Sequence, residues 1–385
     1  MSGILSGIKV MDFGHYIAGP YAGMLLSEQG AEVIKVEPPG GDPFRSQKGF
    51  TVVNRSKKGI SLDLKTPEGR KIALDLAGKA DAVIENFKPG TADRLGVGYE
   101  SVESINPRVV YCSISGFGRN GPYRDMPGWE MLVLSMSTLY TEQNRVGDPV
   151  YQNLLVASHY AGFMAAFYIT AALYAREMSG KGELIDVSLL KSVTAMQPNI
   201  FGNSPAKIRY PFSTRGFMPL VRIYRGSDGA WFVLNAASVG FYTALCTALG
   251  HEEWLTDPIF EGAPFLILPP RSAQVASMLQ SIFNTKPRDE WVDVLRKANI
   301  PCAPVQSVEQ FLVHPHVEAN RLLVEMEEAG IGKIKEMNMP VSLSGTPGAI
   351  KGPSPTLGQH TTEVLTGLGY SSAQLDGLRR KSVIR

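Results

Sequence analysis

Strand-like segments alternate with helix-like segments through the first third of the chain, and this alternation constrains the fold most. Strands are predicted at residues 8–13, 31–36, 60–64, 81–84 and 108–115, and helices at 20–29 and 67–79. The second helix has a clear start, because Thr66 can cap it and Pro67 occupies its first position. Strands that alternate with helices pair in parallel and are joined by right-handed crossovers. The sequence therefore predicts an α/β protein with a doubly wound parallel sheet.

The loop that follows the fourth strand is the most distinctive stretch. The apolar run ends at Ile84 and continues as Glu85-Asn86-Phe87-Lys88-Pro89-Gly90, followed by Arg94-Leu95-Gly96. This pattern is typical of a buried parallel strand whose carboxyl end opens into a ligand crevice. The turn at 14–20, after the first strand, can also present backbone N–H groups to an anionic ligand. It lacks the GxGxxG pattern, which makes a dinucleotide-dependent dehydrogenase a weak hypothesis.

Composition limits the kind of protein and its partners. The 385 residues carry a net charge of +2 and include no long Lys/Arg run, so no nucleic-acid partner is predicted. A short basic cluster at 55–58 fits either a phosphate-bearing ligand or a solvated turn. Cys112, Cys246 and Cys302 have neither metal-ligand nor disulfide spacing, so no metal site is predicted and a reducing compartment is favoured. With no signal-peptide pattern, and with an apolar segment at 161–175 too short to span a bilayer, we expect a cytoplasmic protein without a membrane partner.

The length of the chain and a change in amino-acid composition after about residue 200 indicate a second domain at 205–315. A hairpin is predicted at 223–234, where Asp228-Gly229 separates two apolar runs. Helices are predicted at 160–176, 239–249, 273–298 and 360–369. The segment 209–225 is rich in Arg, Phe and Tyr, and either packs the domain junction or contacts a substrate carboxylate or aromatic group.

Separated motifs in a fixed order resemble the family III CoA-transferases, the superfamily that also contains formyl-CoA transferase and acyl-CoA racemases. They include GAEVIKVEPP, SLDLKTPEG, ENFKPG and GKGELIDVSLL, and the resemblance covers nearly the whole chain. It implies a Rossmann-like large domain built from residues 1–204 and 316–385, a smaller α+β domain at 205–315, and an interlocked dimer. It also implies that a CoA thioester and a carboxylic acid are the substrates, with no tightly bound cofactor.

The same resemblance implies a set of CoA contacts on the turns that follow three strands. These are His15, Tyr16, Ile17, Ala18, Leu62, Lys65, Asn86, Phe87, Arg94 and Leu95. Their chemistry fits, because Lys65 and Arg94 can bind phosphates and Phe87 can face the adenine or the pantetheine. Core packing for Phe87 and surface charge for the two cations remain open alternatives. Relatives often have arginine at the position of Pro38, and Arg45 or Arg55 is the candidate to replace it.

The family's catalytic position is where the chain departs from the resemblance. Most of these transferases use an aspartate that attacks the donor thioester, whereas the matching segment here is Val156-Ala157-Ser158-His159. A serine forms only an ester, which is too weakly activated to return a thioester easily. By resemblance Glu130 is the nearest carboxylate, and His159 is a candidate base. Trp129 stands where transferases often have tyrosine and racemases have a histidine base, which argues against a racemase.

Three hypotheses follow from Ser158. The chain is the subunit without a nucleophile in a heteromeric CoA-transferase, like one subunit of the benzylsuccinate-type enzymes, and works beside an Asp-bearing paralogue. Alternatively, it is a homodimeric acyl-CoA enzyme that uses Glu130, His159 or Ser158 for different chemistry. The third hypothesis is a non-catalytic acyl-CoA-binding protein.

Overall fold

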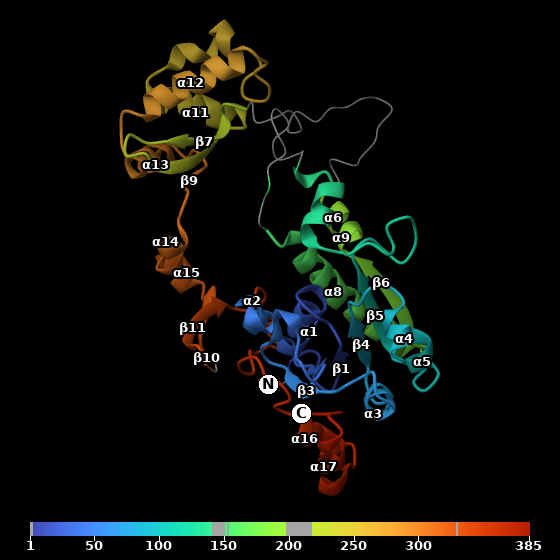
Figure 1. Cartoon of the computed structure of the whole chain (residues 1–385). Coiled ribbons are helices and arrows are strands. Elements are labelled where there is room, and N and C mark those ends of the chain that lie inside the picture. The colour runs from blue at the N-terminus through green and yellow to red at the C-terminus, as the bar shows by residue number, and fades with distance from the viewer. Residues whose placement is uncertain (1–2, 141–150, 152–153, 198–217, 329) are drawn as a thin grey trace. The chain divides into compact units, whose positions relative to one another are not determined.

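The computed structural model describes residues 3–140, 151, 154–197, 218–328 and 330–385 (Figure 1). The chain divides into two compact units. The first comprises Met1–Thr138, Asn153–Pro198 and Glu318–Arg385, and the second comprises Leu139–Gln152 and Asn199–Val317. The junction at 204/205 and the residues Arg209, Phe212, Arg215 and Phe217 lie outside the described residues.

A six-stranded parallel sheet forms the centre of the first unit, in the order β3-β2-β1-β4-β5-β6. Its strands are β1 (Lys9–Asp12), β2 (Glu32–Glu37), β3 (Lys58–Ser61), β4 (Ala82–Glu85), β5 (Val110–Ser115) and β6 (Glu183–Ser188). β4 and β5 are buried along their whole length, as expected for strands covered on both faces. This order is that of a Rossmann-like doubly wound sheet, so the predicted fold class is confirmed.

Helices flank this sheet (Figure 1). They are α1 (Ala18–Glu28), α2 (Gly49–Asn54), α3 (Pro67–Ala77), α4 (Thr91–Arg94), α5 (Tyr99–Glu103), α6 (Glu130–Met136), α8 (Val156–Ser179), α9 (Leu189–Ala195), α16 (Thr361–Gly367) and α17 (Ser372–Arg380). The last two come from the end of the chain, and their Leu365, Leu375 and Leu378 pack into one core cluster with α3 and the sheet. The end of the chain therefore completes the core that its beginning starts.

Helix α8 is the longest element and is longer than predicted. Its 24 residues, with a mean hydropathy of 1.3, would suffice to cross a membrane, but half of the apolar window is buried inside the protein. It packs against α1, β5 and β6. The contact with α1 is close, because a Cβ on Gly162 would lie 2.6 Å from the carbonyl oxygen of Ala18. This is the packing of a core helix.

A hairpin near the end of the first unit was not predicted. It consists of β10 (Leu323–Glu328) and β11 (Gly332–Met337). Glu336 from β11 and Glu28 from α1 both bind the guanidinium of Arg55, at 3.1 and 2.6 Å, and all three side chains are buried. This ion-pair cluster ties the returning segment to the start of the chain.

The second unit has an antiparallel sheet in the order β7-β8-β9. Its elements are β7 (Val221–Arg225), β8 (Trp231–Asn235), β9 (Cys302–Pro304), α11 (Val239–Leu249), α12 (Arg271–Phe283), α13 (Arg288–Lys297), α14 (Val308–Leu312), short 3-10 turns at Glu252–Leu255 and Pro258–Phe260, and α15 (Pro315–Ala319), which crosses into the first unit. The single helix predicted at 273–298 is wrong. Two helices occupy that range, because Pro287 disfavours helix in the residue before it and sits at the start of α13. Tyr224, from the aromatic-rich segment, is buried in this unit's core.

Candidate functional site

A cavity of about 490 Å³ opens at the carboxyl ends of four strands of the large sheet. The strand order reverses between β1 and β4, and in doubly wound folds this switch point is where ligands bind. His15, Leu62, Lys65, Phe87, Arg94 and Leu95, all sequence candidates, line the cavity together with Pro38. Residues up to 80 positions apart in the sequence are therefore brought to one concave surface.

The turn after β1 forms one wall of this cavity and is held by Asn86, which follows β4. The amide oxygen of Asn86 accepts a hydrogen bond from the backbone N–H of His15 at 2.7 Å, and its amide nitrogen donates to the His15 carbonyl at 2.8 Å. The next residue, Tyr16, has φ of 59°, a conformation that only a few non-glycine residues adopt. The ring of Phe87 meets the ring of His15 edge-on at 5.4 Å. Asn86 therefore acts by shaping the turn and does not line the cavity.

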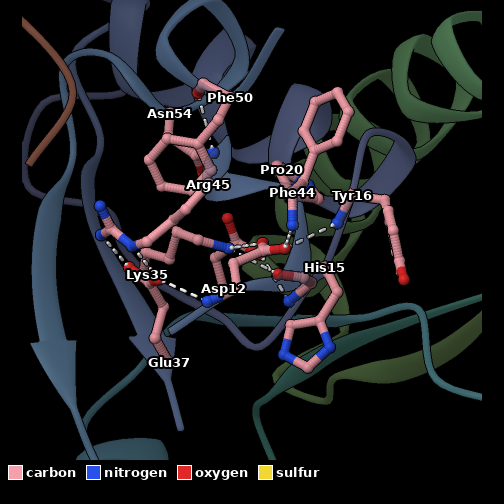
Figure 2. A network of polar contacts seen from close by, with 12 residues as sticks. Asp12, His15, Tyr16, Pro20, Lys35, Glu37, Phe44, Arg45, Phe50 and Asn54 are labelled. Atoms are coloured by element: carbon pink, nitrogen blue, oxygen red, sulfur yellow. Dashed lines mark hydrogen bonds and ion pairs between the residues drawn. The ribbon is translucent and has the colours of Figure 1, made fainter. Parts of the chain in front are cut away.

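Beneath the turn lies a buried network of charged side chains (Figure 2). Lys35 donates to the carbonyl of Gly14 at 2.6 Å and to the carboxylate of Asp42 at 2.9 Å. Asp42 in turn accepts from the backbone N–H of Tyr16 at 3.3 Å. Lys57 donates to Asp12 at 2.7 Å, while Asp12 accepts from the Gly14 N–H at 2.8 Å. Both lysines and both aspartates are buried, so the turn rests on paired charges shielded from water.

Burial and charge together set the protonation of these groups. Burial lowers the pKa of Lys57 to about 8, although Asp12 opposes the shift. For Asp42, burial alone would raise the pKa, but Lys35 and the Phe44 N–H outweigh it and the pKa lies below its usual range. Burial and the nearby Lys35 lower the pKa of His15, so its ring is neutral at pH 7.

Lys65 and Arg94 are exposed, and no other Lys or Arg stands among the described residues that line this cavity. Arg94 donates to the Thr91 hydroxyl at 2.8 Å and has no carboxylate partner in the described part of the chain. Phe87 lines the cavity and also packs against the main core cluster, so its core packing leaves the ring accessible to a ligand in the cavity.

Neither arginine considered as a replacement at Pro38 is available. Arg45 is held by both carboxylate oxygens of Glu37, each at 2.6 Å, and Arg55 is buried between two glutamates. Arg55 and Lys57 are both buried, so most of the basic cluster at 55–58 is neither a solvated turn nor a ligand site. These cations stabilise the fold.

The remaining sequence candidates in the turn are not among the residues that line the cavity. Ile17 and Ala18 are buried at the start of α1. Tyr16 is exposed, and its ring meets Trp129 edge-on at 5.3 Å. Since Trp129 precedes Glu130, this aromatic pair connects the cavity wall to the second group of candidates.

That second group is built around the first turn of α8. Glu130 begins α6, and its carboxylate accepts hydrogen bonds from the backbone N–H of Ala157 at 2.6 Å and of Ser158 at 3.0 Å. The Ser158 hydroxyl donates to the same carboxylate at 2.5 Å. Gly116, after β5, and Gly128 place their backbones so close that neither tolerates a Cβ, which brings the Glu130 segment against the sheet. Glu130 therefore caps α8 at the end where its dipole favours a negative charge.

His159 is adjacent in sequence but is engaged elsewhere. Its Nδ1 lies 2.6 Å from the carbonyl oxygen of Leu155, to which it must donate, and its ring meets Tyr21 edge-on at 5.0 Å. The hydroxyl of Ser158 is bonded to Glu130 and not to this ring. A serine–histidine pair is therefore not formed in this structure.

Across the described ranges, no group of three or more His, Cys, Asp or Glu side chains is arranged to hold a metal ion. The three cysteines are free thiols, and burial raises the pKa of Cys112 and Cys246. Such thiols are poor nucleophiles.

Sequence reasoning missed the Lys35–Asp42 and Lys57–Asp12 pairs and the capping role of Glu130. A weak signal existed for the pairs, because Lys35 interrupts the apolar run Val33-Ile34-Lys35-Val36. No local signal existed for the cap, since Glu130 and Ser158 are 28 positions apart.

The fold and the cavity at its switch point define a Rossmann-like ligand-binding protein, and comparisons with known proteins identify its family. The sequence profile of CoA-transferase family III matches residues 5–361. The succinyl-CoA–D-citramalate CoA-transferase of Chloroflexus aurantiacus is 32% identical, covering 99% of this chain and 98% of its own. The beta subunit of the succinyl-CoA–L-malate CoA-transferase of the same organism is 30% identical with the same coverage. A solved CaiB/BaiF family protein from Brucella suis has a TM-score of 0.80 at 28% identity, covering 96% of this chain and all of its own.

The chain belongs to the family III CoA-transferases and is an enzyme of that type. CoA thioesters are the substrates of such enzymes.

Proposed function

We propose that this chain moves CoA between a CoA thioester and a carboxylic acid as the subunit that lacks the catalytic aspartate, beside an Asp-bearing paralogue. The observation that carries the proposal is the state of Ser158 and Glu130. At the family's nucleophile position stands a hydroxyl that already donates to Glu130. The carboxylate of Glu130 accepts three hydrogen bonds at the N-terminal end of α8. A carboxylate that is stabilised by three hydrogen bonds is a weaker nucleophile. Its attack on a thioester would remove the negative charge that these donors bind.

The CoA moiety occupies the 490 Å³ cavity in this proposal. Lys65 and Arg94 bind its phosphates, and Phe87 packs against its adenine or pantetheine. Arg94→Ala or Lys65→Ala should weaken CoA binding and flatten its dependence on salt, since each removes an exposed cation. Lys79→Ala, which removes another exposed lysine outside the cavity, is the matched control.

A dimer is part of the proposal, with domains at 1–204, 205–315 and 316–385 and with two chains interlocked. Phe163, Phe167, Tyr174 and Met178 follow one another at helical spacing on α8, and 50–82% of each is exposed. Large apolar side chains of this number on one helix favour a protein partner. The relative named a beta subunit supports a paralogue as that partner. The free cysteines support a reducing, cytoplasmic location.

The Ser158–Glu130 contact also favours a second candidate, acyl transfer to Ser158 with Glu130 as base. The Ser158 Oγ would attack the thioester carbonyl, its proton would pass to Glu130 and then to the leaving CoA thiolate, and water would hydrolyse the ester. The net reaction is the hydrolysis of an acyl-CoA to acid and CoA. Mass spectrometry of the chain incubated with acyl-CoA distinguishes this candidate, which predicts an added acyl mass on Ser158. A third candidate, binding without turnover, predicts CoA binding and no reaction in any pairing.

The experiment that tests the main proposal compares the chain alone with the complex recovered from its native host. We expect CoA binding but no CoA transfer by the chain alone, and transfer by a complex whose second subunit has aspartate at the position of Ser158. Transfer by the pure chain at an ordinary enzymatic rate contradicts the proposal.

A further inference from the structure

The buried carboxyl group of Glu85 is not used by the chemistry described so far. It is the last residue of β4, is 5% exposed, and directly precedes Asn86 and Phe87. One carboxylate oxygen accepts a hydrogen bond from the backbone N–H of Phe87 at 2.8 Å. Ser113, its register partner on β5, favours the ionised form of the carboxyl group and so opposes the effect of burial on its pKa. Glu85 therefore closes a small turn around Asn86.

That turn determines two features of the CoA-facing cavity. The backbone between Glu85 and Phe87 directs the Asn86 amide to both backbone groups of His15, at 2.7 and 2.8 Å. It also directs the Phe87 ring into the cavity and against the ring of His15. A weaker hold on the Phe87 N–H loosens both walls together.

We propose that Glu85 is a positioning residue for CoA binding, whose neutral carboxyl group fixes the Asn86–Phe87 turn and whose ionisation loosens it. This inference rests on the proposed function, because it takes the cavity as the CoA site. Glu85 itself does not line that cavity. It lines a separate polar cavity of about 40 Å³ behind the turn.

The charged and titratable groups that face Glu85 come from α4, α5, β5 and the segments that follow β4 and β5, while the neighbouring strand β1 places Asp12 beside Ile84. In the small cavity these are Lys88, Asp93, Tyr99, Tyr111, Arg119 and Arg124. Arg119 favours the carboxylate and Asp93 disfavours it, while burial is the largest influence. Burial also raises the pKa of Tyr111 and of the Cys112 thiol on β5, so both stay neutral.

The balance of these influences makes the carboxyl group titrate near neutrality. Burial raises the pKa of Glu85 to about 7. Below that pH the neutral acid stays buried behind the ordered turn. Above it the buried carboxylate is poorly solvated, and opening of the turn to water relieves that penalty, so ionisation favours opening. CoA should therefore bind less tightly as the pH rises through about 7. His15 does not produce this dependence, because burial lowers its pKa and its ring is already neutral there.

The test measures the dissociation constant of CoA from about pH 6 to about pH 8 for the full chain and for Glu85→Gln. Glutamine keeps the acceptor for Phe87 but cannot ionise. We expect the wild-type chain to bind CoA about fivefold less tightly at the higher pH, because the charged form that dominates there opposes ordering of the turn. Glu85→Gln should stay near the tighter value, with only the titration of the CoA phosphates and, toward pH 8, of Lys57 left. Glu100→Gln, which alters an exposed glutamate on α5, should follow the wild type.

Hydrogen exchange of the Phe87 amide gives a second readout that needs no ligand. Corrected for intrinsic rates, its protection should fall as the pH rises in the wild type and stay flat in Glu85→Gln. If the variant does not fold, the wild-type profile decides alone, and a flat profile overturns the inference. CoA binding with the same pH profile in both proteins overturns the role of Glu85 and leaves the proposed function intact. Absence of CoA binding at every pH overturns both.

Discussion

Replacing Lys35 with methionine tests whether buried ion pairs, unlike pairs on the surface, support the turn that forms the cavity wall. Lys35 is fully buried, and its ammonium group holds both the Gly14 carbonyl and the Asp42 carboxylate. Lys35→Met leaves Asp42 buried without its cation, a change that costs about 3–5 kcal/mol of folding free energy in comparable buried pairs. Because the turn also loses the hydrogen bond from Lys35 to the Gly14 carbonyl, CoA affinity should fall as well.

Lys58→Met provides the matched control. Lys58 starts the neighbouring strand, but its ion pairs with Glu32 and Glu363 are partly exposed on both sides. Such pairs contribute about 1 kcal/mol or less, and this variant should leave CoA binding unchanged. Both variants are compared by urea denaturation, and hydrogen exchange of the β1 and β4 amides reports on the first unit.

A double variant, Lys35→Met with Asp42→Asn, tests the cause of the loss. If the stranded charge of Asp42 dominates, removing it should recover about 1–3 kcal/mol relative to Lys35→Met alone. Acid sensitivity gives an independent check. Because the native pKa of Asp42 is lowered, its stabilisation is present above its usual pKa and is lost as the pH falls through the lowered value. A Lys35→Met protein as stable as Lys58→Met would refute the idea that buried charges hold the turn.

The remaining predictions concern packing, capping and titration. Gly162→Ala should destabilise the protein by about 1–3 kcal/mol, seen as a lower urea midpoint, because its Cβ would press on the Ala18 carbonyl oxygen at 2.6 Å. Glu130→Ala should cost about 1–2 kcal/mol and increase hydrogen exchange in the first turn of α8, with little effect at its far end, because it removes the cap from Ala157 and Ser158. The raised pKa of Glu85 predicts that wild-type stability falls by about 3 kcal/mol between the unfolded pKa near 4.5 and the native pKa of about 7. Glu85→Gln should lack this fall, and a denaturation series that shows the same slope in both proteins would contradict it.

The central sheet was predictable from the sequence because each strand is a short apolar run between turn residues. Every predicted strand of the first unit overlaps an observed one, from β1 to β5. The hairpin β10–β11 was missed since glutamates and lysines interrupt its apolar residues, and cross-strand neighbours such as Glu325 and Lys335 are paired only in the folded protein. Pro287 signals the break before α13, but the helical pattern on either side of it favoured a single helix.

The site was predictable in part for a different reason. The carboxyl ends of parallel strands meet at one edge, so loops that follow β1, β3 and β4 must converge there. That geometry brings His15, Lys65 and Phe87 to one cavity. The partners of buried charges depend on the three-dimensional packing, so they cannot be predicted from spacing along the chain. The pairing of Glu130 with Ser158 across two helices is the clearest example.

The most direct test of the account is an isotope-exchange measurement on the purified chain without a partner. An acyl-CoA is incubated with its own isotopically labelled free acid, with succinate, glutarate, malate and citramalate among the acids, and label in the thioester is followed. We predict CoA binding without exchange for the wild type, and exchange for Ser158→Asp, which places a carboxylate at the position that we propose for the family's nucleophile. Exchange by the wild-type chain alone, or label transfer that is unaffected by the identity of residue 158, would contradict the claim that this position has lost its nucleophile.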